Sequence, residues 1–563
     1  MRRLTPPIHS SISSLITQVI GNKPMCAGKF SLLFGTFATL SVLWTTPVMG
    51  AQKILLSFGP LEFSLSVAAL ETYAREGKIE PELANYTNLL EPEQLESLQE
   101  ILVKPAGVSP VAMAQFFYSP QGEIILERVG ELIQTKARQN GFYALRSALI
   151  LAAAEQDGLT LLNVLKKFPT YAIRINSQRG FEIIGELSEV LETTQEAIAA
   201  VEKQALVEAI SAAPRDFEVL PDLRQSGSLR FSIQSLILVD RQRRRKFEVD
   251  LYLPQSQNNT LVPLVIISHG LGSDRRTFAY LAQHLASHGF AVAVPEHPGS
   301  NSQQLQNLIA GLTSNVTTPQ ELVDRPLDIQ YLLDELEGSF SEQINLKNVG
   351  IIGQSFGAYT ALALAGAGIN FEDLPADCPS QNSLNVSLLL QCLALQLPPQ
   401  DYQLWDERIG AAIAINPLDS IIFGKSQLSQ IQIPVMLVSH SADTVTPPFA
   451  EQILPFSWLT TNNKYLLLLK GATHFSSLAE SVPGSGEQVV ELPPQLLGPD
   501  PLISQSYMQA MGLAFMQTYI AKNQQFQTYL GADYAQSISQ TPMPLSLLQK
   551  LPQQQLFERE AEN

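Results

Sequence analysis

The chain has 563 residues, with 36 Lys and Arg against 53 Asp and Glu and a formal net charge of −17 at pH 7. At roughly 150 residues per domain, this length predicts two or three domains. A chain with this excess of negative charge repels phosphate backbones, and we therefore expect no nucleic-acid partner. Association with a membrane surface would need a local basic patch. Three cysteines exclude a disulfide-rich scaffold and a cysteine-rich metal site, and we expect no metal or organic cofactor.

Residues 1–50 have the pattern of an export signal. The uncharged, mostly apolar run Phe30–Trp44 is followed by small residues, which favours cleavage near Gly50. Two alternatives remain open. Translation could start at Met25, which gives a more compact signal peptide, or the apolar segment could stay as an uncleaved anchor, since it is close to the ~20 residues that span a bilayer. In each case we expect the rest of the chain to be periplasmic or extracellular.

Residues 51–215 are predicted to form an all-helical accessory domain. Apolar positions recur at helical spacing, most clearly over residues 93–102 and 180–210, and prolines that follow Ser mark helix starts. The stretch contains no histidine and no cysteine. We therefore assign it no chemistry.

From residue 223 the pattern changes to short strands that alternate with helices. Residues 229–239 and 247–253 alternate like an antiparallel hairpin around the basic turn 241–246, which is either a solvated turn or a contact for lipid head groups. Continuous apolar strands then follow, separated by helical segments, at 262–268, 290–294, 349–352, 411–415, 434–438 and 465–469.

Such buried strands predict an α/β domain over residues 223–525, with a mostly parallel sheet covered by helices. A hairpin that leads into a sheet of this kind is the order of an α/β-hydrolase. Residues 526–563 are predicted to be a polar C-terminal tail.

A nucleophile motif follows the strand at 349–352. In Gly353-Gln-Ser355-Phe-Gly357, the serine stands between an apolar strand and a helical segment. A tight turn from strand to helix exposes a serine hydroxyl to a base, and the two glycines give the turn room. We therefore predict that Ser355 is a catalytic nucleophile and that Gly353 and Gly357 form its elbow.

The base and the acid of a serine hydrolase of this type follow the nucleophile in the order acid, then histidine. His474 lies just after the strand at 465–469 and is the expected base. Two carboxylates could orient it: Asp443, after the strand at 434–438, is preferred, and Asp419, after the strand at 411–415, is the alternative.

The oxyanion of such a reaction needs two backbone N–H donors. The residue after the nucleophile, Phe356, is expected to supply one. The other should come from the loop His269-Gly-Leu271-Gly, where we choose Leu271 as the donor. We expect His269 to orient this loop rather than to carry a proton.

An insert of about residues 368–405 separates the nucleophile helix from the next strand. It contains Cys378 and Cys392, which in an oxidising compartment are predicted to form a disulfide, with two buried thiols as the alternative. Its apolar run predicts a cap over an acyl pocket, and the alternative is a packed surface hairpin of helices.

The segments SHGLGSDRRTFAYLAQHLASHGFAVAVPEHPGS and GQSFG resemble the platelet-activating factor acetylhydrolase family of α/β-hydrolases over about residues 225–480. DTVTPP and GATHF are also similar to segments of bacterial lipases and cutinase-like polyesterases. The N-terminal region resembles the domain that precedes cyanobacterial exported hydrolases. The resemblance implies the same nucleophile, base and oxyanion donors. It leaves the acid open, because the acetylhydrolases take theirs at the position of Asp419 and the lipases at that of Asp443. The chain also departs from the family at Ala358, where a second glycine is usual.

These patterns together predict an exported serine esterase that hydrolyses carboxylic esters of lipid-like substrates through an acyl-enzyme. The alternatives are a cutinase-like polyesterase or lipase, and a non-catalytic binding protein on a hydrolase fold. The sequence leaves the acyl chain, the head group and the oligomeric state undetermined.

Overall fold

The computed structural model describes residues 50–58, 61–87, 91–255, 260–378, 385–479 and 494–552. The predicted export signal lies outside these residues, apart from Gly50. Within the described ranges, no helix combines the length and the apolar character needed to cross a membrane.

The N-terminal region is built on a small sheet, so the prediction of an all-helical domain is wrong. The strands β1 (Lys53–Phe58), β2 (Leu61–Ser66), β3 (Ile133–Thr135) and β4 (Ala172–Asn176) lie in the order β2-β1-β4-β3. β1 pairs in parallel with β4, which comes more than a hundred residues later, so the sheet depends on a non-local contact that helical periodicity does not reveal.

Helices surround this sheet and bury one apolar core with it. Serine side chains cap several of the helix starts, as the sequence predicts: Ser109 and Ser119 each accept a hydrogen bond from a backbone amide three residues on, ahead of a proline. The helices are α1 (Val67–Glu76), α2 (Pro81–Thr87), α3 (Pro92–Val103), α4 (Pro110–Phe117), α5 (Pro120–Leu132), α6 (Phe142–Ala153) and α7 (Leu161–Lys167).

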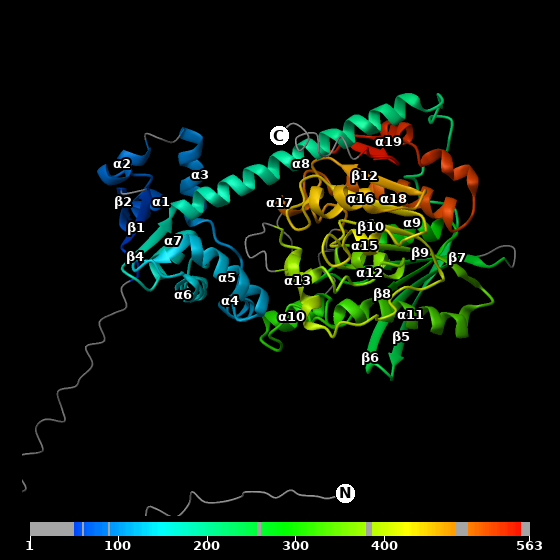
Figure 1. The fold of residues 1–563 in the computed structure, drawn as a ribbon, viewed down its shortest axis with the longest axis horizontal. Coiled ribbons are helices and arrows are strands. Elements are labelled where there is room, and N and C mark those ends of the chain that lie inside the picture. Colours follow the sequence, from blue (N-terminus) through cyan, green and yellow to red (C-terminus); the bar gives the residue numbers. More distant parts are fainter. Residues whose placement is uncertain are drawn as a thin grey trace, which may run out of the picture. The chain divides into compact units, whose positions relative to one another are not determined.

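The helix α8 (Ser177–Ser211) leads from this region into the second one (Figure 1). Its C-terminal half buries Ala197, Val201 and Ala205 in a core shared with the large sheet. Lys470, at the end of a strand of that sheet, forms an ion pair with Glu202 of α8 at 2.9 Å. The prediction of a helix over residues 180–210 is confirmed.

The second region contains a nine-stranded sheet in the order β13-β12-β11-β10-β9-β7-β8-β6-β5. The six strands from β12 to β8 run parallel, and β5 and β6 form the predicted antiparallel hairpin at one edge. The strands are β5 (Phe231–Asp240), β6 (Arg245–Pro254), β7 (Val262–Ser268), β8 (Ala291–Pro295), β9 (Ile344–Gln354), β10 (Ile409–Ile415), β11 (Val435–His440), β12 (Lys464–Leu469) and β13 (Leu545–Leu548).

Apolar side chains cover both faces of this sheet, which explains why its strands are continuously apolar. On β7, Val265 and Ile267 belong to the core under α9 (Ala279–Ser287) and α18 (Pro501–Tyr519). Leu264 and Ile266, on the other face, belong to the core under α11 (Glu321–Phe340). The predicted α/β class, with a mostly parallel sheet covered by helices, is confirmed.

The C-terminal segment is part of the domain rather than a polar tail. β13 pairs antiparallel with β12, and α19 (Ala532–Ile538) packs beside it, with η3 (Gln524–Tyr529) before it. Leu545, Leu547 and Leu548 are buried. The prediction of a tail over residues 526–563 is therefore wrong as far as residue 552, because three leucines in a Gln-rich stretch suffice for an edge strand.

The insert after α12 (Phe356–Leu364) holds the disulfide between Cys378 and Cys392, so that prediction is confirmed. Ser387 and Gln391 of the insert donate hydrogen bonds to the buried carboxylate of Glu451, at 2.9 and 3.0 Å. The remaining short helices are α10 (Ser302–Ile309), α13 (Leu374–Asp377), α14 (Leu388–Gln391), η1 (Cys392–Gln396), α15 (Gly424–Leu428), η2 (Phe449–Ile453), α16 (Leu454–Trp458) and α17 (Pro494–Leu497).

Candidate active site

Ser355 occupies a strained turn between β9 and α12. Its backbone has φ 54° and ψ −117°, in a region that residues other than glycine rarely adopt, and its N–H donates to the Ile415 carbonyl at 2.8 Å. A Cβ atom at Gly353 would lie 2.0 Å from the Gly357 carbonyl oxygen, and one at Gly357 would lie 2.0 Å from that of Ser268. The glycines therefore allow the close approach that holds the serine in this conformation, as the sequence predicts for an elbow.

The structure brings Asp443 and His474 together at the ends of the adjacent strands β11 and β12. Asp443 Oδ2 lies 2.6 Å from His474 Nδ1, and both side chains are buried. Burial alone would raise the pKa of Asp443, but the neighbouring His474 and the hydrogen bonds from His474 and Thr446 lower that pKa below its ordinary value. The carboxylate is therefore ionised at neutral pH and fixes the Nδ1–H tautomer of the imidazole.

Asp443 is itself held in place by the loop that follows it. Its Oδ1 accepts the N–H groups of Val445 and Thr446 at 2.7 and 2.8 Å, and its Oδ2 accepts the Thr446 hydroxyl at 2.8 Å. Thr446 was not predicted from the sequence. An Asp whose side chain binds the amides two and three residues later is a recognisable local motif, so the signal was present in DTVT.

Gln354, which was also not predicted from the sequence, links the candidate nucleophile to the candidate base. It is the residue before Ser355, and its side-chain nitrogen lies 3.3 Å from both the Nε2 atom and the carbonyl oxygen of His474. With the imidazole proton on Nδ1, the Nε2 atom is the acceptor in this contact. The Nε2 atom of His474 is thereby held beside the elbow.

The backbone N–H groups of Leu271 and Phe356, beside the elbow, have no acceptor in the part of the chain that the structure describes. The next residue along the loop, Gly272, donates its N–H to the Ser300 carbonyl at 2.8 Å. Preorganised donors of this kind are what a developing oxyanion requires. Their assignment to that role stays a prediction.

His269 lies at the start of the same loop, and its ring contacts backbone groups on both sides. Its Nδ1 lies 2.8 Å from the Gly270 carbonyl oxygen, and its Nε2 accepts the His297 N–H at 3.1 Å. Burial holds the pKa of His269 well below its ordinary value, and the nearby Arg325 lowers it further. The ring is thus neutral, and its two contacts orient the loop as expected from the sequence.

Asp419, the alternative acid, follows β10 but does not contact His474. Its side chain is fully buried, and neither carboxyl oxygen has a hydrogen-bond partner within the described residues. Its backbone N–H donates to Glu451 Oε2 at 2.8 Å. Burial raises the pKa of Asp419 well above its ordinary value, and the nearby Glu451 raises it further, which favours the neutral form and makes Asp419 a poor partner for an imidazolium.

The raised pKa of Asp419 leads to a prediction for stability. Above about pH 4 the unfolded carboxyl releases its proton while the folded one keeps it, so the folded state loses stability as the pH rises, by up to about 1.4 kcal/mol per pH unit until the folded pKa is reached. Asp419→Asn removes this dependence. We expect the free energy of unfolding of the variant, relative to the unsubstituted protein, to increase between pH 5 and pH 8 in denaturant titrations. A constant difference over this range would show that Asp419 is ionised in the folded protein.

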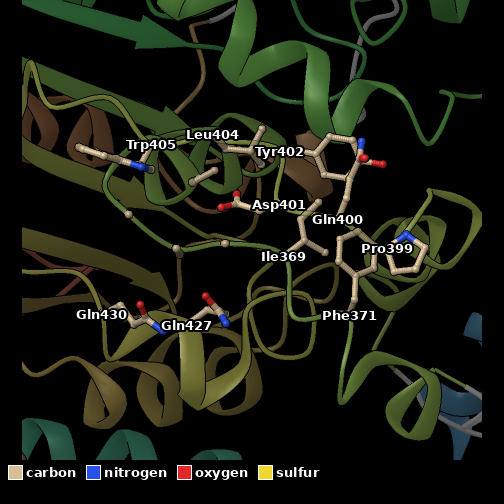
Figure 2. A pocket seen from close by; sticks show the side chains of 14 residues that line it. Ile369, Phe371, Pro399, Gln400, Asp401, Tyr402, Leu404, Trp405, Gln427 and Gln430 are labelled. Atoms are coloured by element: carbon tan, nitrogen blue, oxygen red, sulfur yellow. The ribbon is translucent and has the colours of Figure 1, made fainter.

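A cavity of about 550 Å³ lies away from these residues, beside the C-terminal end of α12. Figure 2 shows the loop of residues 399–405 on one side of it and Gln427 and Gln430 on the facing side. Its lining includes none of Ser355, Asp443 and His474. We place the candidate site at the elbow because the hydrogen-bonded Asp–His pair is there.

Two family models match parts of the chain. Residues 50–176 match the model of a family described as α/β hydrolase of unknown function, and residues 249–308 match that of platelet-activating factor acetylhydrolase, isoform II. None of the curated proteins compared matches the chain. The second region has the α/β-hydrolase fold, and the protein resembles a hydrolase of the acetylhydrolase type.

The two matches do not reach the candidate catalytic residues. The acetylhydrolase match covers the span from β6 to α10, which includes Leu271 but ends before Ser355. The other match covers the N-terminal sheet and its helices. The roles of Ser355, Asp443 and His474 therefore rest on the local geometry.

Proposed function

We propose that the protein is an exported serine esterase that hydrolyses carboxylic esters of lipid-like substrates. The observation that carries the proposal is the 2.6 Å hydrogen bond between Asp443 and His474 beside a serine on a strained elbow. In this proposal Ser355 is the nucleophile, His474 the base and Asp443 the acid.

The reaction would proceed in two halves. Ser355 Oγ attacks the ester carbonyl carbon while its proton passes to His474 Nε2, and Asp443 stabilises the imidazolium that forms. The N–H groups of Leu271 and Phe356 donate to the oxyanion. The intermediate expels the alcohol, which takes the proton from His474, and leaves an acyl-serine. Water, activated by His474, then releases the acid and restores the serine.

A lipid-like ester is supported by the insert and by the family match. The Ser387 N–H donates to the Val445 carbonyl at 3.0 Å, so the insert contacts the loop that carries the acid. The insert presents the exposed apolar side chains Val386 and Leu395. A cap with apolar side chains next to the acid loop favours acyl chains over charged acyl groups, and the acetylhydrolase match favours a lipid ester.

Export is supported by the disulfide in the insert, because such bonds persist in oxidising compartments. The signal in residues 1–50, its cleavage and its possible role as an anchor stay predictions.

Labelling with a fluorophosphonate tests the function directly. We expect the native protein to react at Ser355, which peptide mapping would locate, and the heat-denatured protein to remain unlabelled, since only an activated serine attacks phosphorus rapidly. Hydrolysis of 4-nitrophenyl esters with acetyl, hexanoyl and dodecanoyl groups would then define the acyl preference. A native protein that is neither labelled nor active on these esters would instead support a non-catalytic binding protein.

A further inference from the structure

Arg325, on α11, is a fully buried cation that forms no ion pair in the described part of the chain. Its guanidinium donates to neutral oxygens and lies over an aromatic ring. Nη2 donates to the His269 carbonyl and to Ser268 Oγ, the latter at 3.3 Å, and Nη1 donates to Ser300 Oγ at 3.0 Å. A guanidinium buried without a carboxylate partner is costly, so its position calls for a reason.

The other side of the same guanidinium contacts the nucleophile helix. Arg325 Nε donates to Thr360 Oγ1 at 3.2 Å, and Arg325 Cζ lies 4.5 Å from the centroid of the Phe356 ring. The Thr360 hydroxyl in turn donates to the Phe356 carbonyl at 2.9 Å. One side chain thus contacts both segments that carry the candidate oxyanion donors: the loop before Leu271 and the first turn of α12.

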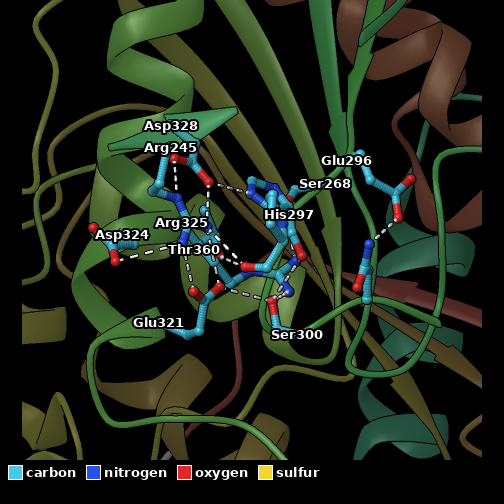
Figure 3. A network of polar contacts seen from close by, with 12 residues as sticks. Arg245, Ser268, Glu296, His297, Ser300, Glu321, Asp324, Arg325, Asp328 and Thr360 are labelled. Atoms are coloured by element: carbon cyan, nitrogen blue, oxygen red, sulfur yellow. Dashed lines mark hydrogen bonds and ion pairs between the residues drawn. The ribbon is translucent and has the colours of Figure 1, made fainter. Parts of the chain in front are cut away.

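Nearby carboxylates have other cations as partners (Figure 3). Asp328 accepts two hydrogen bonds from Arg245, both at 2.8 Å, and Glu321 accepts two from it, at 2.6 and 3.2 Å. Arg243 also lies 2.9 Å from Asp328. Arg243 and Arg245 belong to the basic turn of the hairpin, so the prediction of a solvated turn fails for these two side chains.

The hydroxyl groups of Ser300 and Ser268 connect Arg325 with the carboxylates that are paired with Arg245. Ser300 Oγ donates to Glu321 at 3.0 Å while it accepts from Arg325. Ser268 Oγ lies 3.1 Å from His297 Nε2, and His297 Nδ1 lies 3.2 Å from Asp328. The carboxylates therefore keep their Arg245 partner when Arg325 is removed, and a variant at Arg325 leaves no unpaired buried carboxylate.

We propose that Arg325 is a positioning residue that sets the geometry of the oxyanion hole. By holding the His269 carbonyl and the first turn of α12 on one planar group, it fixes the Leu271 and Phe356 amides relative to each other. Its positive charge also lies over the ring of Phe356. This inference rests on the proposed esterase function and adds a residue to it that does not touch the substrate.

The test compares Arg325→Met and Arg325→Lys with Arg146→Met in the full chain. Arg146 is a matched control, since it is a buried arginine that stacks on the Tyr118 and Phe142 rings, each 4.4 Å away, in the N-terminal region. The readouts are thermal unfolding, kcat and KM for 4-nitrophenyl acetate, inhibition by a trifluoromethyl ketone, and hydrogen exchange of residues 268–272.

We expect Arg325→Met to lower kcat on the order of 100-fold with KM changed less than about threefold, because oxyanion donors act on the transition state. The ketone, whose adduct carries the oxyanion, should lose affinity in parallel, and exchange at residues 268–272 should accelerate. Arg325→Lys, which keeps the charge but not the planar fork, should lose about tenfold in kcat. Arg146→Met should leave kcat, KM, the ketone affinity and the exchange at residues 268–272 unchanged, even if it lowers thermal stability.

An Arg325→Met protein with kcat within threefold of the unsubstituted protein and unchanged exchange would overturn the inference. If that variant fails to fold, Arg325→Lys decides by the same two criteria. Failure of the proposed function gives a different result: the unsubstituted protein then behaves like Ser355→Ala in both the ester and the ketone assay, and the positioning role is rejected together with it.

Discussion

Replacement of Ser355 by alanine is expected to lower kcat for ester hydrolysis by about 10⁶-fold, to the level of the uncatalysed background plus what binding alone provides. The substitution removes the single oxygen that attacks the carbonyl. The fold should be unaffected, because the elbow is set by the close contacts of Gly353 and Gly357 and not by the serine hydroxyl. Alanine also tolerates the strained backbone about as well as serine.

Steady-state kinetics on 4-nitrophenyl acetate, with thermal unfolding measured in parallel, would check this result. Ser426→Ala, at an exposed serine after β10, is the matched control and should retain full activity. A Ser355→Ala protein with activity close to that of the control would reject Ser355 as the nucleophile and with it the acyl-enzyme mechanism.

Asp443→Asn should lower kcat by about 10⁴-fold, the second largest effect that we expect. The surrounding hydrogen bonds determine the orientation of the side-chain amide that the substitution introduces. Because the N–H groups of Val445 and Thr446 both point at Oδ1, the amide oxygen takes that position and the NH₂ group faces His474. The Nδ1 atom of His474 must then accept, which moves the imidazole proton to Nε2. An imidazole in that tautomer cannot take the proton of Ser355.

Asp419→Asn is the matched comparison, since it makes the same change at the end of the neighbouring strand. We expect its kcat to stay within about threefold of the unsubstituted protein, because a neutral buried carboxyl is replaced by a neutral amide of the same shape. Rates of both variants are compared at pH 7, where the lowered pKa of Asp443 leaves this carboxylate ionised in the unsubstituted protein. A large loss of kcat in Asp419→Asn, together with an unchanged kcat in Asp443→Asn, would establish the acetylhydrolase-type placement of the acid.

Much of the second region could be read from the amino-acid sequence. Strands buried on both faces are continuously apolar, and this made β7, β9 and β12 recognisable without any knowledge of their neighbours. The elbow could also be predicted from the sequence, since its two glycines mark a five-residue turn in which close contacts leave no room for a Cβ atom. The pairing of Cys378 with Cys392 also followed from proximity along the chain.

The N-terminal sheet and the C-terminal edge strand were missed for a common physical reason. β4 pairs with β1 and β13 with β12, in each case far along the chain, and only β1 also has a local partner, the neighbouring strand β2. The alternation of Leu61, Phe63 and Leu65 with polar residues was a usable signal for β2. Short apolar runs such as β1 fit a helix or a strand equally well until the partner is known.

The sequence by itself determined the class of the second region and predicted a candidate nucleophile and a candidate base, because each depends on a pattern within a few neighbouring residues. Only the tertiary structure separated Asp443 from Asp419, two aspartates at the ends of adjacent strands. One carboxylate meets an imidazole and three donors and becomes more acidic, while the other meets apolar surroundings and the Glu451 carboxylate and becomes less acidic. The same holds for Arg325, whose partners come from three separate segments. Electrostatic roles of this kind depend on burial and on groups distant in sequence, and neither is encoded in a local pattern.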